Sequence, residues 1–211
     1  MTEQTPAAAE SVVFGEEDVE ILHEEVLFKG FWTLKRLTLR HRCYAGGWSE
    51  PMTREVHCRG EAVGVLLYDP ALDAVGLVEQ FRVGPWAKGD SRPWLLELVA
   101  GLREEGEDPE GVAIRETREE AGCEVQHLRH IASYYSSPGG CDEYFHLYCA
   151  RVSLAGVSLL HGEEHEHEDI RLHVIPVADL PALLAAGRCN NAHSLLALQW
   201  FEARRAELRA P

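Results

Sequence analysis

The chain has 211 residues, of which 45% are hydrophobic and 26% are charged, a composition that suits one globular domain with or without a modest extension. Its formal net charge of −15 argues against binding to nucleic acids or anionic membranes, because both present phosphates that would repel such a surface. A small phosphorylated substrate is compatible with this charge if a divalent cation held by carboxylates screens the phosphates.

The N-terminal part is predicted to be rich in β-structure. Strand-like patterning covers residues 19–42 and resumes at 54–61, and the sequence Tyr44-Ala45-Gly46-Gly47 between these segments is typical of a turn. We therefore expect residues 1–56 to form a β-rich appendage and residues 57–211 to form the main domain.

The main domain is predicted to begin with two strands. An apolar run at 62–68 stops at Asp69-Pro70, and a second strand covers 74–82. Residues 85–93 are predicted to form a loop, and the mostly apolar segment 94–100 leads from this loop to Gly101.

A helix is predicted next. Asp108 suits an N-cap, Pro109 suits the first helical position, and Gly122 is placed to end the helix. Later strands are expected at 126–136, 144–152 and 170–176, followed by helices at 179–186 and from about 191 to 209. Strands on both sides of a central helix, with further helices at the end, favour an α/β layered sandwich with a mixed sheet.

The six cysteines are scattered and contain no C-x-x-C pair, which argues against a zinc site. The N-terminus does not resemble a signal peptide, and no apolar run approaches the length of a membrane span. We therefore expect reduced thiols and a cytoplasmic protein.

Three carboxylates mark the predicted helix. Glu116, Glu119 and Glu120 are spaced i, i+3 and i+4, which places them on one helix face. A solvated acidic surface is the alternative interpretation. However, like charges at this spacing destabilise a helix, and the macrodipole disfavours anions near its C-terminal end. A bound hard cation, Mg²⁺ or Mn²⁺, would account for their presence.

The surrounding segment 101–123 resembles the signature of the Nudix family, G-x5-E-x7-R-E-U-x-E-E-x-G-U, where U is a bulky apolar residue. All seven fixed positions match, at Gly101, Glu107, Arg115, Glu116, Glu119, Glu120 and Gly122. Thr117 and Cys123 stand where aliphatic residues are usual, and both are small enough to pack.

This resemblance implies an α/β/α sandwich with a mixed sheet and a loop–helix–loop that carries the site. It implies metal ligands at Glu116, Glu119 and Glu120, with Glu119 also counted as catalytic, and a further ligand at the Ala100 carbonyl. Glu107 and Arg115 would form an ion pair that braces the loop against the helix.

Residues outside the signature resemble bacterial ADP-ribose pyrophosphatases within this family. The run Trp94–Gly101, Pro138 at 15 positions beyond Cys123, and the nearby Glu143 all match. The segment 168–171 and Asn190-Asn191-Ala192 match as well. The implied reaction is Mg²⁺-dependent hydrolysis of ADP-ribose to AMP and ribose 5-phosphate.

The general base in the resembled enzymes is a glutamate on a loop after the signature. Glu166 aligns best, while Glu163, Glu164 and Glu168 are rivals, and a solvated acidic loop without chemistry is the alternative. The histidines of this segment, 161–169, do not have the spacing of a metal site.

Substrate contacts are implied by the same resemblance. Arg82 would bind the diphosphate, as guanidinium suits phosphate geometry, and Arg54 and Glu143 would also contact the substrate. Phe31 and Trp48 would stack on adenine. The alternatives are a surface ion pair for Arg82 and ordinary strand packing for the two aromatic residues. The resembled enzymes are homodimers that exchange their N-terminal β-regions, so we expect a homodimer here.

Two other functions stay open from the sequence. The first is the same chemistry on another nucleoside-diphosphate sugar or on a dinucleotide. The second is a catalytically silent domain that binds ADP-ribose, although the presence of every glutamate of the signature disfavours it.

Overall fold

The computed structural model describes residues 12–162 and 167–209. They divide into two compact units. The first unit runs to Arg59 and also includes Ser137–Asp142, whereas the second comprises Gly60–Ser136 and the chain from Glu143 onward.

The first unit is built on a three-stranded antiparallel sheet. A short 3-10 turn, Glu16–Asp18, leads into β1 (Val19–Lys29), which pairs with β2 (Thr33–His41), and β2 pairs in turn with β3 (Met52–Cys58). No residue of these three strands is buried. The sheet therefore has no enclosed core within the unit, although several of its apolar side chains would gain from burial.

The second unit is built on a mixed sheet, as predicted, and this sheet has eight strands. Its strands run in the order β10-β11-β5-β4-β9-β8, with β6 paired to β5 and β7 paired to β4. The pairing of β4 with β9 is parallel and the other pairings are antiparallel. The strands are β4 (Glu61–Asp69), β5 (Ala74–Phe81), β6 (Trp94–Glu97), β7 (Val99–Arg103), β8 (His127–Tyr135), β9 (Tyr144–Arg151), β10 (Leu160–His161) and β11 (Ile170–Pro176).

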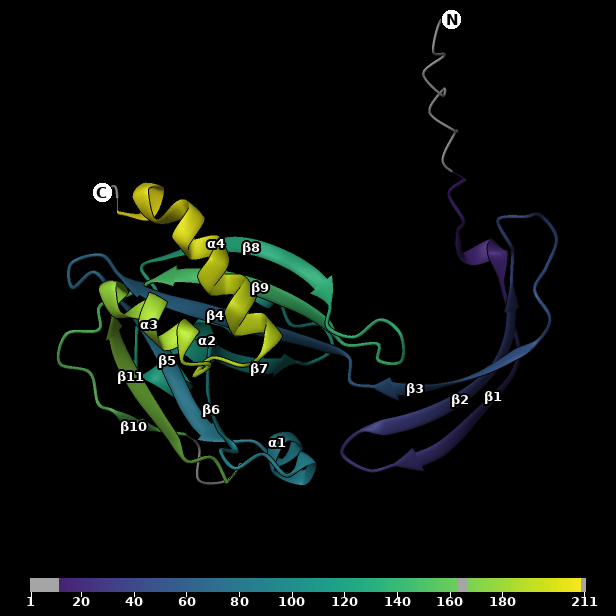
Figure 1. The fold of residues 1–211 in the computed structure, drawn as a ribbon, viewed down its shortest axis with the longest axis horizontal. Coiled ribbons are helices and arrows are strands. Elements are labelled where there is room, and N and C mark those ends of the chain that lie inside the picture. The colour runs from purple at the N-terminus through teal and green to yellow at the C-terminus, as the bar shows by residue number, and fades with distance from the viewer. Residues whose placement is uncertain (1–11, 163–166, 210–211) are drawn as a thin grey trace, which may run out of the picture. The chain divides into compact units, whose positions relative to one another are not determined.

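Helices cover both faces of this sheet, which confirms the α/β/α sandwich (Figure 1). Helix α2 (Pro109–Ala121) packs in one apolar cluster with alternate residues of β4 such as Val63 and Val65. Helices α3 (Leu180–Ala185) and α4 (Ala192–Leu208) pack in a second cluster with Leu66 and Tyr68. The strand β4 is apolar on both faces because each face is covered.

Two local predictions were wrong. The segment predicted as a loop contains a short helix, α1 (Val83–Lys88), which Gly89 ends in the left-handed conformation at φ 86°. Proline is tolerated in the first turn of a helix, so Pro85 does not prevent it. The two-residue strand β10 was not predicted, because a pairing this short leaves no periodicity in the sequence.

All six cysteines carry free thiols. Among the described residues, no helix is long and apolar enough to cross a membrane.

Candidate active site

The helix α2 begins and ends where its sequence predicts. The Asp108 side chain accepts a hydrogen bond from the Gly111 N–H at 3.3 Å, Pro109 occupies the first turn, and Gly122 ends the helix at φ 61°. Thr117 and Cys123 are buried, which confirms that both residues pack into the core. The helix is thus fixed against the sheet, and it carries Glu116 and Glu120 on its buried side.

Glu120 is almost completely buried, with 2% of its surface exposed. Its carboxylate accepts a hydrogen bond from the Ala100 N–H of β7 at 2.9 Å. Burial raises the pKa of Glu120 to about 8, the Ala100 hydrogen bond opposes the shift, and the charges of Glu116 and Glu168 add to it. Ala100 therefore lies beside the acidic cluster, as the sequence implied, whereas a ligand role for its carbonyl stays a prediction.

Glu116 lies against the glycine that opens the signature. A β-carbon built on Gly101 would be 1.7 Å from Oε1 of Glu116, so only glycine leaves room for this carboxylate. Burial raises the pKa of Glu116 to about 7, against the opposing charge of Arg115. The strand β7 and the helix α2 thus hold two desolvated carboxylates next to each other.

Arg115 is the counter-charge of the cluster. Its Nη1 lies 2.7 Å from Oε1 of Glu116 and 2.9 Å from Oε2 of Glu119. The expected pair with Glu107 is present through Nε, at the longer distance of 3.8 Å. Arg115 therefore connects the loop to the helix, as predicted, but its shorter contacts are with two of the expected metal ligands.

Arg82 follows β5 and lies close to the same cluster. Its Nε donates to Oε2 of Glu97 at 2.6 Å, and its charge lowers the pKa of Glu120 against the effect of burial. Glu97 was not predicted as a partner, although its position in the run Trp94–Gly101 could have indicated one. The pair leaves the second edge of the guanidinium available for an anion.

A second set of contacts, which the sequence analysis missed, holds the loop before α2. Arg103 Nε donates to the Glu107 carbonyl at 2.6 Å, and Arg103 Nη1 lies 2.8 Å from Oε2 of Glu61. The same Glu61 oxygen is 2.8 Å from Nε2 of His146 in β9. These residues fix the loop to β4 and β9, and no motif in the sequence signals them because they lie on separate strands.

Of the remaining predicted residues of the second unit, Glu143 and Glu168 are described by the structure and Glu166 is not. Glu143 is buried just before β9, and its charge adds to the burial that raises the pKa of Tyr134 to about 12. Glu166 lies outside the described residues. Its rival Glu168 is described, and its negative charge contributes to the raised pKa values of Glu116 and Glu120.

The expected substrate residues of the first unit are surface groups. Phe31 is 82% exposed and packs edge-on against Trp32 with ring centroids 4.5 Å apart. Trp48 lies under the guanidinium groups of Arg40 and Arg42, at 5.0 Å and 4.4 Å. Arg54 is exposed on β3 and donates to the Thr53 carbonyl. Their contact with a substrate stays a prediction.

Within the described ranges, no three acidic, histidine or cysteine side chains are grouped as a ready metal cage. The contacts above give the physical reason. Arg115 contacts one oxygen each of Glu116 and Glu119, and the Ala100 N–H donates to one oxygen of Glu120, so in this state the carboxylates are oriented by protein partners.

Comparison with known proteins places these observations in a family. A model of the NUDIX domain matches residues 59–198. The chain is 43% identical over 198 residues to the ADP-ribose pyrophosphatase of Haemophilus influenzae, covering 93% of this chain and 91% of the relative. It is 41% identical over 191 residues to the ADP-ribose pyrophosphatase of Escherichia coli K12, covering 90% and 91%.

A more distant relative is a GDP-mannose pyrophosphatase of Klebsiella pneumoniae, 30% identical over 185 residues with 88% of this chain and 92% of that protein covered. A solved structure described as an ADP compounds hydrolase superposes with a TM-score of 0.71 over 94% of this chain and 100% of that chain. At 21% identity, that likeness concerns the fold alone. The signature on α2, the sandwich that carries it and these matches together show that the chain belongs to the Nudix family of hydrolases.

Proposed function

We propose that this Nudix hydrolase cleaves the diphosphate linkage of ADP-ribose, giving AMP and ribose 5-phosphate. The substrate is inferred from two relatives named ADP-ribose pyrophosphatase, 43% and 41% identical over nine-tenths of the chain or more. The relative named GDP-mannose pyrophosphatase, at 30% identity, supports a nucleotide-sugar alternative less well.

The observation that carries the proposal is the pair of desolvated carboxylates, Glu116 and Glu120, at the junction of β7 and α2. Removing a carboxylate from water is unfavourable unless a proton or a cation compensates its charge. The ligand atoms that Glu116 and Glu120 offer are all oxygens. The Glu116 carboxylate lies against Gly101, where a larger residue would place its side chain. Such a donor set fits a hard divalent cation.

We infer that the cation is Mg²⁺, with Mn²⁺ as a substitute, and that Glu116, Glu119, Glu120 and the Ala100 carbonyl hold it. When bound, it would neutralise the substrate diphosphate and lower the pKa of a water molecule. Arg115 contacts one oxygen of each of Glu116 and Glu119, and the second oxygen of each carboxylate would bind the cation. Arg82 would contact the diphosphate through the guanidinium edge that Glu97 leaves available.

The general base is proposed to be Glu166, by its place in the acidic loop. Its rival Glu168 is supported by the electrostatic influence it exerts on both buried carboxylates. A general base must lie within hydrogen-bond reach of the attacking water. We therefore expect that either Glu166 or Glu168, and not both, is essential for turnover. The chemistry then depends mainly on positioning and electrostatic stabilisation.

We further propose that the first unit mediates a homodimer. Its sheet has no buried residue, and apolar side chains such as Val26 (52% exposed), Phe28 (62%) and Phe31 (82%) stand in solvent. Exposed apolar groups gathered on one small sheet are typical of an interface. Phe31, Trp48 and Arg54 would then serve a substrate bound within the dimer. The free thiols suit a cytoplasmic enzyme.

The test is turnover of ADP-ribose, GDP-mannose and a dinucleoside polyphosphate, with products separated by chromatography in Mg²⁺ and in EDTA. The proposal expects ADP-ribose to give AMP and ribose 5-phosphate fastest, and only with the cation. Glu166→Gln and Glu168→Gln, assayed side by side, identify the base by which variant loses turnover. ADP-ribose that binds tightly but is not cleaved would show a silent domain instead.

A further inference from the structure

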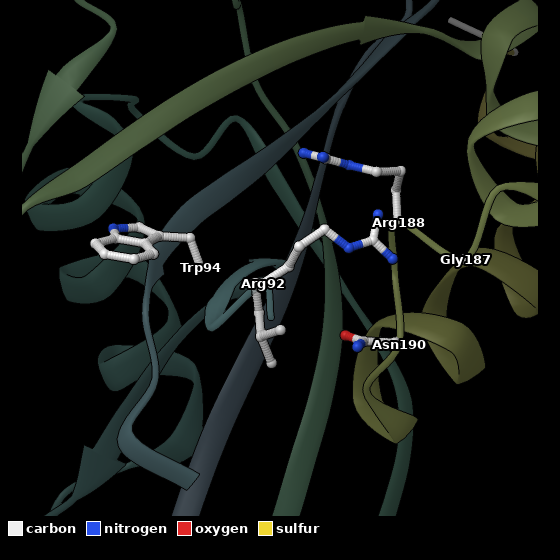
Figure 2. Close-up of a pocket in the computed structure, with 6 residues that line it drawn as sticks. Arg92, Trp94, Gly187, Arg188 and Asn190 are labelled. Carbon is white, nitrogen blue, oxygen red and sulfur yellow. The ribbon is translucent and has the colours of Figure 1, made fainter. Parts of the chain in front are cut away.

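A shallow hollow lies on the second unit, away from the acidic cluster. Its lining residues are Arg92, Trp94, Leu95, Gly187, Arg188 and Asn190 (Figure 2). One wall comes from the segment that enters β6, and the other comes from the connection between α3 and α4. The hollow thus joins two segments that are far apart in the sequence.

Two cationic side chains meet in this hollow. Figure 2 shows the Arg92 side chain crossing toward the segment that carries Arg188 and Asn190, with the Arg188 side chain running back alongside it. The positive charge of Arg188 is compensated by Glu79, whose Oε1 lies 3.0 Å from Nη2 of Arg188. The Arg92 side chain makes no hydrogen bond or ion pair with any residue that the structure describes.

The convergence is notable because the chain as a whole carries a net charge of −15. Carboxylates are abundant, yet Arg92 is directed toward another arginine rather than toward one of them. Two guanidinium groups with a neighbouring amide supply the planar donors that phosphate oxygens accept. Trp94 borders the hollow, but its ring is directed away from the two arginines and packs edge-on against Phe81, with centroids 5.3 Å apart (Figure 2).

The hollow and the acidic cluster lie on opposite faces of the sheet. Glu79 follows Leu77 by two residues in β5, and Leu77 belongs to the cluster covered by α3 and α4. Glu116 and Glu120 belong to α2, which packs on the other face. The diphosphate that is cleaved at α2 therefore cannot also occupy the hollow.

We propose that this hollow is an accessory site for a phosphate monoester, held by Arg92, Arg188 and the Asn190 amide. A monoester dianion suits two guanidinium groups better than a diester does, because it presents more charge on one phosphorus. This site needs no divalent cation, unlike the proposed metal centre at α2, so the two sites can be tested apart.

The experiment is calorimetric titration of the full chain in EDTA with AMP and, separately, with inorganic phosphate. Wild type and Glu124→Gln, which removes an exposed carboxylate outside both sites, should bind with the same affinity. Arg92→Gln should weaken binding by about tenfold, the loss expected for one charge-assisted contact. Lys88→Gln, an exposed cation outside the hollow, removes the same charge and should leave binding unchanged.

Arg188→Gln is the second variant, with its melting temperature checked because it also loses the Glu79 contact. Preference for AMP would assign the site to a nucleotide, and equal affinity would assign it to free phosphate. Absence of binding by both probes at millimolar concentration would overturn the proposal. So would equal weakening by Arg92→Gln and Lys88→Gln, since that would show only the general effect of charge.

Discussion

The carboxylate of Glu120 accepts a hydrogen bond from the backbone N–H of Ala100, 2.9 Å away and twenty positions earlier in the chain. This bond ties the last turns of α2 to β7 and orients the most deeply buried charge of the site. It also opposes the rise in pKa that burial causes, so it keeps the ionised form accessible.

Replacing Glu120 with glutamine should abolish most activity and preserve the fold. The amide oxygen can still accept the Ala100 hydrogen bond, but the charge that would hold a cation is lost. We expect kcat/KM for ADP-ribose to fall by about two to three orders of magnitude or more. The matched control is Glu124→Gln, which removes an exposed carboxylate paired with Arg118 and should leave kcat/KM unchanged. Near wild-type turnover in Glu120→Gln would contradict the assigned role.

Replacing Gly101 with alanine should displace Glu116. The new methyl group would stand 1.7 Å from Oε1 of that carboxylate, which no side-chain adjustment of a few tenths of an ångström can relieve. We expect lower thermal stability and a weakened dependence of activity on Mg²⁺. Gly111→Ala is the control. Gly111 lies in α2, the helix that carries Glu116, and a β-carbon at this position would meet nothing within 4 Å. That variant should gain about 0.5–1 kcal/mol in unfolding free energy, measured by urea titration.

The metal-free protein should lose stability as pH rises. Burial raises the pKa values of Glu116 and Glu120 to about 7 and about 8, from an ordinary value of 4.5 that applies to the unfolded chain. The folded state therefore binds more protons than the unfolded state between these values, so the unfolding free energy falls with increasing pH. Each carboxyl contributes at most about 1.4 kcal/mol per pH unit.

Urea unfolding in EDTA, from about pH 5 to about pH 8, measures this slope directly. Glu120→Gln cannot ionise at that position, so its slope should be shallower than that of the wild type. A wild-type unfolding free energy that rises through the same range would show that these carboxyls are not buried as described.

Asn191 should contribute to stability as the N-cap of α4. Its side chain accepts from the Ser194 N–H at 2.9 Å and donates to the Leu96 carbonyl at 3.3 Å, so it joins the helix to β6. Asn191→Ala should lower the unfolding free energy by about 1–2 kcal/mol. The neighbouring Asn190 is exposed, and Asn190→Ala should leave stability unchanged. Equal stability of the two variants in denaturant titration would argue against the cap.

The sequence predicted those parts of the site that depend on local patterns. Asp108, Pro109 and Gly122 bound α2 because capping is decided within a few residues, and the spacing of Glu116 and Glu120 follows from helix geometry. The i, i+4 contact between Arg115 and Glu119 could have been predicted in the same way. The contact of Arg115 with Glu116, another proposed metal ligand, could not be predicted, because it depends on how the loop places Glu107.

Contacts between strands were beyond the reach of local patterns. The pair of Arg82 with Glu97 requires β5 and β6 to be neighbours, and the pair of Glu61 with His146 requires β4 beside β9. The short helix α1 was missed because six residues are too few to show a helical periodicity. The placement of Glu166, which the sequence assigned by alignment within an acidic run, lies outside the described residues.

The parallel pairing of β4 with β9 has a consequence for synthesis on the ribosome. The register joins Glu61 to Tyr144 and Tyr68 to Arg151, so β4 emerges from the ribosome long before β9 does. Until translation passes Arg151, β5 and β7 can pair with one edge of β4, but its other edge stays open. A nascent chain stalled before that point should therefore be a preferred client of chaperones and a substrate for proteolysis.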